Sequence, residues 1–580
     1  MSNQNLEEQR HSLAHLLAAA VLELYPDALR TIGPAIDDGF YYDFDNLSIG
    51  TDDLRKIEKR MKRLLPSWKT FDGQEVSESE AREAFRSNPY KLELIDEIIA
   101  KGEKITLYTS GNFVDLCRGG HSSEMNKIDP ESFKLDRVAG AYWRGDEKRK
   151  MLTRIYGVAF DSKTELERFE QMRKDAKERD HRKIGKELDL FTFSDLVGSG
   201  LPLFTPRGTL MRDLIIEKIQ TLQKNFGYEK VTIPHITKKA LYETSGHWDK
   251  FGDELFKVHG KKENDDFVMK PMNCPHHTQI YAAQPRSYKD LPLRYMESTM
   301  VYRDEQAGEL LGLSRVRSIT QDDGHVFCTP DQIKTEVKNI VSVINDFYTS
   351  VDMLKPGQYW VSLSVRDPKT PEEYLGDGSK WDAAEAALEE IAKEENLPYK
   401  RVEGEAAFYG PKLDFQFTDA IGREWQLGTA QLDFQMPERF GLEYTDSDGE
   451  RKTPVMIHRA VAGSLERFMA VMIEHFAGNF PLWLAPTQVS VIPIGDDHVE
   501  FAQKIHSALT EKGLRADINI TNDGFGKKVR KAKKFKIPYF LIIGDKEVAD
   551  GNITVESRDD GNLGRMTIEE IVEKLSKENN

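Results

Sequence analysis

The sequence predicts a multidomain α+β protein organised around a central antiparallel sheet. At 580 residues the chain is longer than one hydrophobic core usually serves, so three or four domains are expected. Between residues 188 and 484, short β-propensity segments are interspersed with helical patterns, which favours an antiparallel sheet over a βαβ repeat. A run of mixed charges from 163 to 186 separates this block from the preceding part of the chain.

The composition predicts a soluble globular protein in the cytoplasm. Hydrophobic residues make up 39% and charged residues 31%, and the sequence shows neither a signal peptide nor an apolar run of about 18 residues, so no membrane partner is expected. Three cysteines are too few for a disulfide framework, which favours a reducing compartment. The net charge of −16 argues against indiscriminate nucleic-acid binding, so any nucleic acid must be bound by local patches.

The first domain is predicted to be α+β and to carry potential metal ligands. His11 and His15 lie four residues apart on an amphipathic helix, so both rings project from one helical face. Cys117 and His121 add a thiol and a third imidazole. The four residues fit a Zn²⁺ set, or they are solvated residues without a joint role. The predicted elements are a helix over 4–24 and strands over 32–44 and 138–143.

A solvent-exposed linker helix is predicted next. The stretch from Lys163 to Lys186 is dense in opposite charges at i,i+4 spacing and poor in apolar residues. Ser162 and Glu165 fit a capping box at its start. The helix is interpreted either as an RNA-facing spacer or as a solvated linker, and both interpretations mark a domain boundary.

A hairpin from Leu293 to Cys328 is the most informative stretch of the central block. Met296–Tyr302 and Arg315–Thr320 are predicted to be its two strands, and the polar cluster Gln321–His325 is expected where the second strand ends. Arg303 and Arg315 then stand at the two shoulders of the hairpin. Since guanidinium groups bind phosphate bidentately and stay charged, the hairpin is predicted to clamp a polyanion.

Two further features of this block suit an anionic ligand and a metal. Arg467 is expected in the first turn of a helix, where free N–H groups favour a phosphate. Cys274, His325 and His458 supply one thiol and two imidazoles, a zinc set with a fourth position open. Because these three lie far apart in the sequence, and lone histidines are more often core or surface residues than ligands, their spacing alone favours unrelated residues.

The tail from Ala485 is predicted to be a compact α/β domain of alternating strands and helices. Its main feature is a basic run of seven cations in ten residues, starting at Lys527. The run is interpreted as an RNA-backbone contact, with a solvated helix face as the alternative.

Several motifs resemble a known family. Tyr302-Arg303-Asp304-Glu305 with Arg315-Val316-Arg317, and Gly463-Ser464-Leu465-Glu466-Arg467, resemble motifs 2 and 3 of class II aminoacyl-tRNA synthetases, and Gly227 to Pro234 resembles the dimer-interface motif 1. Lys270–Pro275, Thr320–His325 and Gln426–Asp433 are similar to the threonyl-tRNA synthetase family. The HSLAH and CRGGH segments resemble its editing domain, and the tail resembles its anticodon-binding domain. The resemblance covers essentially the whole chain.

The resemblance implies a class II antiparallel-sheet core and a ligase reaction. ATP and threonine would form threonyl-adenylate, and the threonyl group would pass to the 3′ end of tRNA(Thr), in a homodimer with Mg²⁺ accompanying ATP. The implied domains are editing (1–160), a linker helix (161–187), catalytic (188–484) and anticodon-binding (485–580). The alternatives are a prolyl or seryl type of class II synthetase, or a non-catalytic tRNA-binding relative, which would be expected to have lost one of the motif arginines.

The resemblance also implies roles for individual residues. For catalysis they are Arg303, Arg467 and His247; for ATP binding, Arg303, Glu305, Arg315, Gln426, Thr429 and Arg467. For threonine binding they are Met272, Arg303, Gln321, Asp323, Tyr409, Gln431 and Ser464; for zinc, Cys274, His325 and His458. For editing they are His11, His15, Lys91, Asp115, Cys117 and His121; for tRNA binding, Asn522, Lys527, Lys528, Arg530 and Glu547.

The implied chemistry explains why two sites are needed. Threonine can chelate zinc through its amino and hydroxyl groups, whereas isosteric valine has no hydroxyl. Serine keeps the hydroxyl and lacks only a methyl group, worth about 1–3 kcal/mol, so a second site must hydrolyse seryl-tRNA. Alanyl-type editing domains bind zinc through a similar quartet, but no zinc is expected in this one. Two departures are a missing N-terminal ubiquitin-like domain, either natural or through shortening of the sequence, and Glu556 where an arginine is expected.

Overall fold

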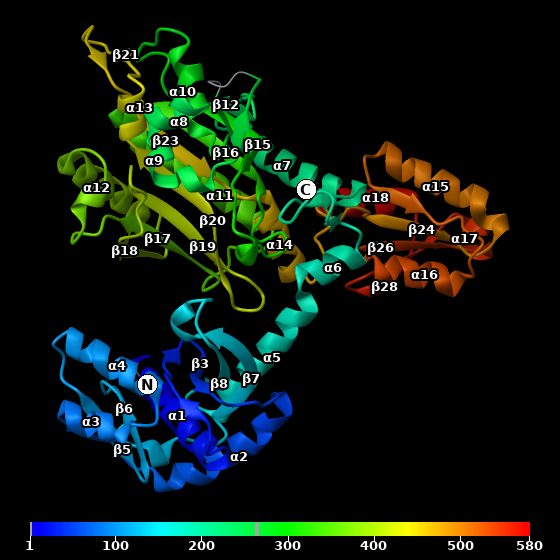
Figure 1. Cartoon of the computed structure of the whole chain (residues 1–580). Helices are drawn as coiled ribbons and strands as arrows, with labels where there is room; N and C mark the ends of the chain where they lie inside the picture. The colour runs from blue at the N-terminus through cyan, green and yellow to red at the C-terminus, as the bar shows by residue number, and fades with distance from the viewer. Residues whose placement is uncertain (1–2, 262–265, 580) are drawn as a thin grey trace. The chain divides into compact units, whose positions relative to one another are not determined.

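The computed structural model describes residues 3–261 and 266–579. The chain divides into two compact units, Met1–Lys174 and Asp175–Asn580, drawn from blue to cyan and from cyan to red in Figure 1. In the described residues, no helix has the length and apolar character needed to cross a membrane.

The N-terminal unit combines two antiparallel sheets with helices, as predicted for an α+β domain. One sheet has the order β1-β3-β8-β7, with β2 paired to β3, and the other has the order β4-β5-β6. The Ala- and Leu-rich α1 consists of good helix formers and buries residues 12–21 against the first sheet. The helices are α1 (Asn3–Leu24), α2 (Leu54–Leu64), α3 (Glu78–Ala84) and α4 (Pro89–Ala100). The strands are β1 (Leu29–Arg30), β2 (Ala35–Ile36), β3 (Gly39–Asp45), β4 (Asp72–Glu75), β5 (Thr106–Ser110), β6 (Phe113–Leu116), β7 (Phe133–Tyr142) and β8 (Met151–Ala159).

The predicted linker helix is two helices. The first, α5 (Lys163–Arg179), is mostly exposed as expected, but the second, α6 (His181–Glu187), buries residues of its first turns. The break falls at Asp180, which leaves the helical region and accepts a hydrogen bond from the N–H of Arg182. The expectation of one solvated helix is therefore wrong for α6, which packs against α14 (Leu465–His475).

The second unit is built on an eight-stranded sheet of order β11-β15-β16-β23-β20-β19-β17-β18. It is antiparallel apart from the pairs β11–β15 and β17–β18 at its two edges, which confirms the predicted antiparallel core. Its strands are β11 (Glu229–Lys230), β15 (Leu293–Tyr302), β16 (Ser318–Cys328), β17 (Tyr359–Val365), β18 (Tyr399–Glu403), β19 (Lys412–Thr418), β20 (Glu424–Asp433) and β23 (Val455–Ala460). Smaller strands are β9 (Phe191–Thr192), β10 (Leu203–Phe204), β12 (Ile236–Lys238), β13 (Lys257–His259), β14 (Asp266–Met269), β21 (Tyr444–Thr445) and β22 (Arg451–Lys452).

The helices of this unit leave one face of the sheet for a pocket. On the opposite face, α11 (Ile333–Ser350) and α14 share the main hydrophobic core with the sheet, in line with their adjacent positions in Figure 1. On the pocket face, α10 (Cys274–Ala282) packs against β16. The other helices are α7 (Pro206–Lys224), α8 (Lys239–Ser245), α9 (His247–Phe251), α12 (Gly378–Glu394) and α13 (Gln435–Arg439).

The hairpin is present, but its second strand differs from the prediction. β15 and β16 pair antiparallel over their whole length, from Leu293 opposite Phe327 to Tyr302 opposite Ser318. Arg315 lies in the connection before β16, and residues 321–325 lie inside that strand, not at its end. The reason is that β16 is an interior strand, so its polar residues face a pocket and do not mark a turn.

A five-stranded sheet of order β25-β24-β26-β27-β28 ends the chain. The helices α15 and α18 share one core with it, and α16 shares a second core with residues that alternate with those of the first, so helices cover both faces. Two of its elements, α17 and β28, were not predicted. The predicted strands are 489–494, 516–518, 539–543 and 554–557, and the predicted helices are 499–512, 527–535 and 568–577. The strands are β24 (Val489–Pro493), β25 (Ala516–Ile518), β26 (Tyr539–Ile543), β27 (Ile553–Ser557) and β28 (Gly561–Met566). The helices are α15 (Val499–Glu511), α16 (Phe525–Lys534), α17 (Asp545–Asp550) and α18 (Ile568–Glu578).

Candidate functional site

A row of polar residues crosses the pocket face of the eight-stranded sheet. The register places His325 of β16 opposite His458 of β23, His458 opposite Gln431 of β20, and Gln431 opposite Lys412 of β19. Because side chains alternate between the faces of a strand, residues two positions away point the same way. Residues far apart in the sequence therefore meet on one surface.

A cavity of about 400 Å³ lies over this row. It brings together predicted residues of the zinc, threonine and ATP sets, with polar and apolar groups both contributing to its wall. Its lining includes Met272, Cys274, Arg303, Gln321, Asp323, His325, Tyr409, Gln426, Thr429, Gln431 and His458.

The three predicted zinc ligands converge on one side of this cavity. Cys274 opens α10, and its sulfur and one nitrogen each of His325 and His458 all lie within 4.8 Å of one another. His325 Nε2 and His458 Nδ1 are 3.0 Å apart, and all three residues are buried.

The outer nitrogens of the two imidazoles have partners that fix their protons. His458 Nε2 lies 2.9 Å from Asp433 Oδ2, and because a carboxylate only accepts, Nε2 must donate. His325 Nδ1 lies 2.7 Å from His277 Nδ1, and His277 Nε2 faces the Glu297 carboxylate at 3.7 Å. Placing the His277 proton on Nε2 makes His325 Nδ1 the donor.

These proton positions fit a cation between the ligands. Both inner nitrogens, His325 Nε2 and His458 Nδ1, then direct lone pairs at each other across 3.0 Å. A metal ion would relieve this repulsion, and a carboxylate on the outer nitrogen, as at His458, is a usual support of a metal-bound histidine. Burial raises the pKa of the Cys274 thiol well above its usual value, so the protein alone does not form a thiolate. A bound zinc ion would supply the charge that stabilises it.

Beside the ligands, the predicted threonine-binding residues form a polar wall. Asn273 donates to Asp323 Oδ2 at 2.9 Å, which fixes that carboxylate in the cavity. The Tyr409 hydroxyl donates to Gln431 Oε1 at 3.3 Å, and Gln431 Nε2 donates to the carbonyl of Gly410 at 3.2 Å. The Asp323 carboxylate, the Gln431 amide and the Tyr409 hydroxyl therefore line the same cavity as the predicted zinc ligands.

Further cations lie near Arg303, which lines the cavity, although Arg467, Arg315 and Ser464 are not among its lining residues. Ser464 caps α14 by accepting from the N–H of Arg467, whose Nε donates to the carbonyl of Ser314 at 3.2 Å. Burial, together with the nearby guanidinium groups of Arg303 and Arg315, lowers the pKa of Arg467. The charges of Arg303 and Arg467 repel each other, and a bound polyphosphate would relieve that repulsion.

Arg315 is already engaged by acidic partners. Its guanidinium group binds Glu305 at 2.7 Å and Glu309 at 3.0 Å, and it is partly exposed. Arg317 donates to the main-chain carbonyl of Glu305 at 2.8 and 3.0 Å. Of the two shoulders proposed as a phosphate clamp, Arg303 therefore lines the cavity, whereas Arg315 is held by carboxylates.

Asp414 is a site residue that the sequence did not reveal. Its Oδ1 accepts from Gln426 Nε2 and from Thr429 Oγ1, both at 2.8 Å, and Lys412 binds its Oδ2 at 2.6 Å. This buried carboxylate orients two of the predicted ATP-binding residues. Asp433 of β20 was missed in the same way, and for both carboxylates a charged residue within a largely apolar interior strand would have been the signal. His277, a buried histidine of α10, was also missed.

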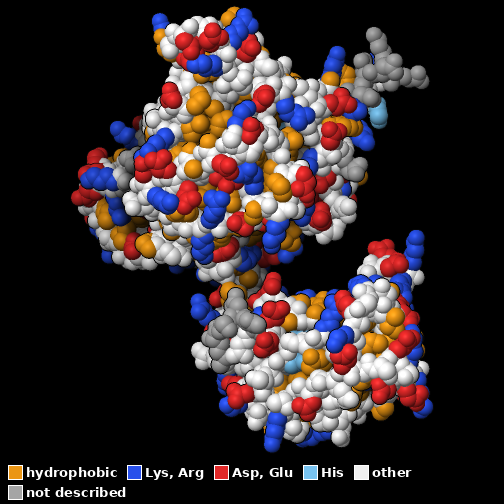
Figure 2. Space-filling view, turned by 90° about the vertical axis from the view of Figure 1, so that its left-hand side faces the viewer, with side chains coloured by type: hydrophobic (Ala, Val, Ile, Leu, Met, Phe, Trp, Pro, Cys, Tyr) orange, Lys and Arg blue, Asp and Glu red, His pale blue; other side chains and the backbone are white. Residues whose placement is uncertain are grey.

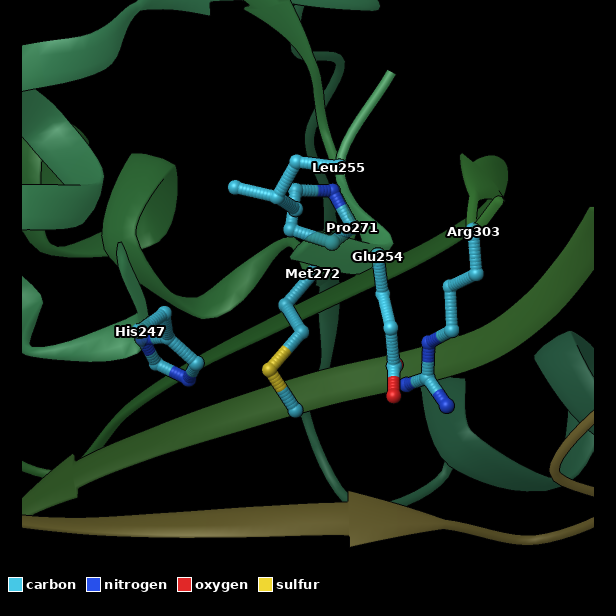
Figure 3. Close-up of a pocket in the computed structure, with 6 residues that line it drawn as sticks. All are labelled: His247, Glu254, Leu255, Pro271, Met272 and Arg303. Carbon is cyan, nitrogen blue, oxygen red and sulfur yellow. The ribbon is translucent and has the colours of Figure 1, made fainter. Parts of the chain in front are cut away.

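A smaller cavity of about 60 Å³ adjoins the first and shares Pro271, Met272 and Arg303 with it. Figure 3 shows His247, from the start of α9, on the far side of Met272 from Arg303. His247 Nδ1 lies 2.8 Å from Ser245 Oγ. Burial and the charge of His458 lower the pKa of His247 to about 4, so the ring is neutral near pH 7.

In the N-terminal unit, the structure brings the four predicted ligands together. The nearest nitrogens and sulfur of His11, His15, Cys117 and His121 all lie within 4.8 Å of one another. Cys117 Sγ is 3.4 Å from both His11 Nε2 and His121 Nε2. Burial alone would raise the pKa of Cys117, but hydrogen bonds with His11, His121 and His15 outweigh it and lower the pKa to about 3.

The buried Asp115 carboxylate lies beside this cluster and pairs with one of its histidines. It binds Lys91 at 2.6 Å, His15 at 3.2 Å and the Tyr42 hydroxyl at 2.5 Å, and it is almost fully buried. Burial would raise the pKa of Asp115, but Lys91, His15 and Arg30 hold it well below the usual range. A cavity of about 450 Å³ opens over these residues. All six residues predicted for editing are therefore neighbours.

The C-terminal domain exposes only part of its predicted RNA-binding set. Asn522, Lys527 and Arg530 are exposed. Lys528 is buried and donates to the carbonyl of Pro493 at 3.1 Å, while the buried Glu547 accepts from Gly544 and Thr554. A direct RNA contact by the last two is not supported, because internal partners occupy their charges. On the face visible in Figure 2, Lys and Arg side chains are interspersed with Asp and Glu.

Comparisons with known proteins agree with this arrangement. The family model "tRNA synthetase class II core domain (G, H, P, S and T)" matches residues 256–476. "Anticodon binding domain" matches 488–578, and "Threonyl and Alanyl tRNA synthetase second additional domain" matches 105–156. The fold and the pocket thus define a class II aminoacyl-tRNA synthetase. The chain belongs, more narrowly, to the threonine–tRNA ligase family.

The relatives carry this assignment. The threonine–tRNA ligase of Gloeobacter violaceus is 46% identical over 99% of this chain and 92% of its own length. That of Porphyromonas gingivalis is 47% identical over 98% and 87%, respectively. A solved "RNA binding domain of Threonyl-tRNA synthetase" from Cryptosporidium parvum has a TM-score of 0.65 and 34% identity, covering 69% of this chain and 98% of its own. Giardia lamblia prolyl-tRNA synthetase, at 18% identity and TM-score 0.56 over 70% of this chain and 80% of its own, shares the fold.

Proposed function

We propose that this chain attaches threonine to tRNA(Thr) in two steps. ATP and threonine first form threonyl-adenylate and pyrophosphate, and the threonyl group then moves to the 3′ end of the tRNA. The observation that carries the proposal is one cavity lined both by a Cys–His–His cluster and by Arg303, with Arg467 close enough to Arg303 for their charges to interact. It suits an amino acid and a polyphosphate placed side by side.

In the activation step, the protein acts mainly by positioning and charge. Arg303, which lines both cavities, would hold the α-phosphate beside the amino-acid carboxylate, and Arg467 would meet the γ-phosphate. Gln426 and Thr429, fixed by Asp414, together with Glu305 and Arg315, would seat the nucleotide. Mg²⁺ bound with ATP would offset phosphate charge. Fixed cations at the reacting phosphorus are what in-line attack requires.

Selection of the amino acid would depend on the three predicted zinc ligands. Cys274, His325 and His458 would hold a zinc ion, to which threonine would bind through its amino and hydroxyl groups. Asp323, fixed by Asn273, would accept from the substrate hydroxyl, and Tyr409 and Gln431 would close the wall around the methyl group. Valine would leave these buried polar groups without a partner, which rejects it strongly.

Transfer and proofreading would use other parts of the chain. The neutral His247 lies in the adjoining cavity, where the tRNA end would enter for transfer. Residues 1–160 would hydrolyse seryl-tRNA in the cavity over Cys117 and Asp115 without a metal ion. Residues 485–580 would bind the anticodon through exposed residues such as Asn522 and Arg530, and 161–187 would link the editing domain to the catalytic domain, 188–484.

The proposal also includes the oligomeric state of the chain and its cellular compartment. The edge strand β11, within the segment that resembles the dimer-interface motif, would lie at the interface of a homodimer. Three free cysteines support a reducing cytoplasm.

The proposal is tested with the purified full chain and a tRNA(Thr) transcript. Threonine should be attached to the RNA in an ATP-dependent reaction, and pre-formed seryl-tRNA should be hydrolysed. The variant Cys117→Ala should still attach threonine but accumulate seryl-tRNA. Failure to attach threonine would overturn the ligase proposal, and unchanged hydrolysis in Cys117→Ala would overturn the assignment of the second site.

A further inference from the structure

One buried cluster of titratable side chains lies outside the proposed substrate cavity. Ligand-type atoms of Asp180, His181 and Glu474 lie within 4.8 Å of one another. His181 begins α6, two residues after α5 ends, and both His181 and Glu474 are buried. The geometry resembles a metal site, but the hydrogen bonds point to another role.

Protein groups already occupy both ring nitrogens of His181. Nδ1 lies 2.6 Å from Glu474 Oε1, and since a carboxylate only accepts, Nδ1 must be the donor. The main-chain N–H of Leu313 donates to Nε2 at 3.0 Å. A neutral ring with its proton on Nδ1 satisfies both partners and leaves no lone pair for a metal ion.

The partner of Nε2 belongs to a small hydrogen-bonded turn between β15 and β16. Leu311 and Arg315 exchange two main-chain hydrogen bonds, at 3.2 and 3.3 Å, and the Leu313 side chain between them is fully buried. The turn ends at Arg315, one of the cations whose charge reaches Arg467. The position of the turn therefore determines the position of the Arg315 guanidinium group.

Helix α14 holds this turn at two points. Arg467 donates directly to the carbonyl of Ser314 at 3.2 Å. Seven residues later, and so two turns along the same face of the helix, Glu474 holds His181, which in turn accepts from Leu313. Loss of His181 would leave one anchor in place and remove the other.

We propose that His181 is a positioning residue for ATP: it fixes the Leu311–Arg315 turn relative to α14, so that Arg315 and Arg467 face the same phosphate chain. The inference deepens the proposed function and rests on it. The neighbouring Gly312 fits closely, because a Cβ there would lie 2.3 Å from His181 Nε2, and its φ of +51° suits glycine. The turn and the ring thus meet without space between them.

Two amide substitutions separate the roles of the two nitrogens. In His181→Asn, the amide can reach Glu474 but not Leu313, whereas in His181→Gln the longer amide can place its oxygen near the position of Nε2. In threonine-dependent ATP–pyrophosphate exchange, His181→Asn should raise the KM for ATP about tenfold, as expected when a buried N–H loses its partner. The KM for threonine should stay unchanged, and His181→Gln should recover most of the loss.

A matched control is His498, another buried histidine, which accepts from the N–H of Gly495 at 3.0 Å in the C-terminal domain. His498→Asn should leave the KM for ATP unchanged. Gly312→Ala disturbs the His181 contact from the opposite side and should raise the KM for ATP as His181→Asn does.

The inference is overturned if His181→Asn lowers the melting temperature but keeps the wild-type KM for ATP, or if the KM values for ATP and threonine rise together. Absence of threonine-dependent exchange in the wild-type protein would instead contradict the proposed function. The two failures are therefore distinguishable in one assay.

Discussion

Replacing Asp433 by asparagine tests how the protein prepares His458 for zinc. Asp433 is fully buried, and its Oδ1 accepts from the N–H groups of Gln435 and Met436 at 2.8 and 2.9 Å. In Asp433→Asn this oxygen must remain in place to satisfy both donors, so the new amide nitrogen points at His458 Nε2. His458 Nε2 can then only accept a hydrogen bond from the amide. The ring proton therefore moves to Nδ1, the atom that would bind the metal.

The size of the effect follows from this change of tautomer. Loss of a partner that orients a metal-bound histidine typically costs about 10- to 100-fold in metal affinity, or about 1.4–2.8 kcal/mol. We expect the upper end of this range, because Asn not only removes the acceptor but also favours the wrong tautomer. Zinc affinity can be measured on the full chain by competition with a chromophoric chelator.

A matched control is Asp414→Asn, another buried carboxylate on the same face of the sheet. Asp414 orients Gln426 and Thr429 and touches none of the three zinc ligands by a hydrogen bond or ion pair that the structure describes. Its substitution should raise the KM for ATP and leave zinc affinity unchanged. The reasoning about tautomers is refuted if Asp433→Asn, correctly folded by its melting profile, binds zinc as tightly as the wild-type protein.

Three other predictions concern the remaining domains. Since the pKa of Cys117 is lowered to about 3, its alkylation by iodoacetamide in the full chain should change little between pH 8 and pH 5, and a tenfold fall per pH unit would contradict the thiolate. The depressed pKa of Asp115 stabilises the N-terminal unit fully above the pKa of an unfolded aspartate, about 3.9, and this contribution is lost as the pH falls toward the folded value. Asp115→Asn should therefore lower the melting temperature at pH 7 and lessen its dependence on acid, whereas equal acid sensitivity in both proteins would count against the Lys91–Asp115 pair. In the C-terminal domain, Arg530→Ala should raise the KM for tRNA several-fold with a weaker salt dependence, but Lys528→Met should act on stability alone; a reversed order would show that the buried cation reaches the RNA.

Much of the fold followed from local patterns. The helix predicted over 4–24 is α1, and the hairpin and the antiparallel core are present, because amphipathic and alternating patterns report directly which face of an element is buried. The same patterns misplaced the second strand of the hairpin. Polar residues inside β16 resemble turn residues in the sequence. Only the assembled sheet shows that a pocket lies beside them.

The candidate site depended on long-range register. Cys274, His325 and His458 approach one another because β16 pairs with β23 and α10 packs on β16, and no local spacing encodes that. The residue types suggested these ligands and the resemblance to a family favoured them, but neither revealed the residues that support them. Asp433 and His277 become visible only when the strands are assembled and each ring nitrogen must find a partner.

The burial of charges was also beyond local reasoning. Lys528 lies in a basic run that predicts an RNA contact, yet its position on the inner side of α16 directs it to the carbonyl of Pro493. In the same way, the predicted linker ends in α6, where His181 enters the core. Helical phase could have indicated both, since each lies on the apolar side of its helix.

The central claim is that one row of residues across the sheet selects threonine while it is activated. ATP–pyrophosphate exchange with threonine, serine, valine and proline tests it most directly. The account predicts fast exchange with threonine, a kcat/KM about 10- to 200-fold lower with serine, and a loss of about 10⁴-fold or more with valine, which lacks the hydroxyl. Proline should give none. Exchange with valine comparable to that with threonine, with proline alone, or with none of the four would contradict the account.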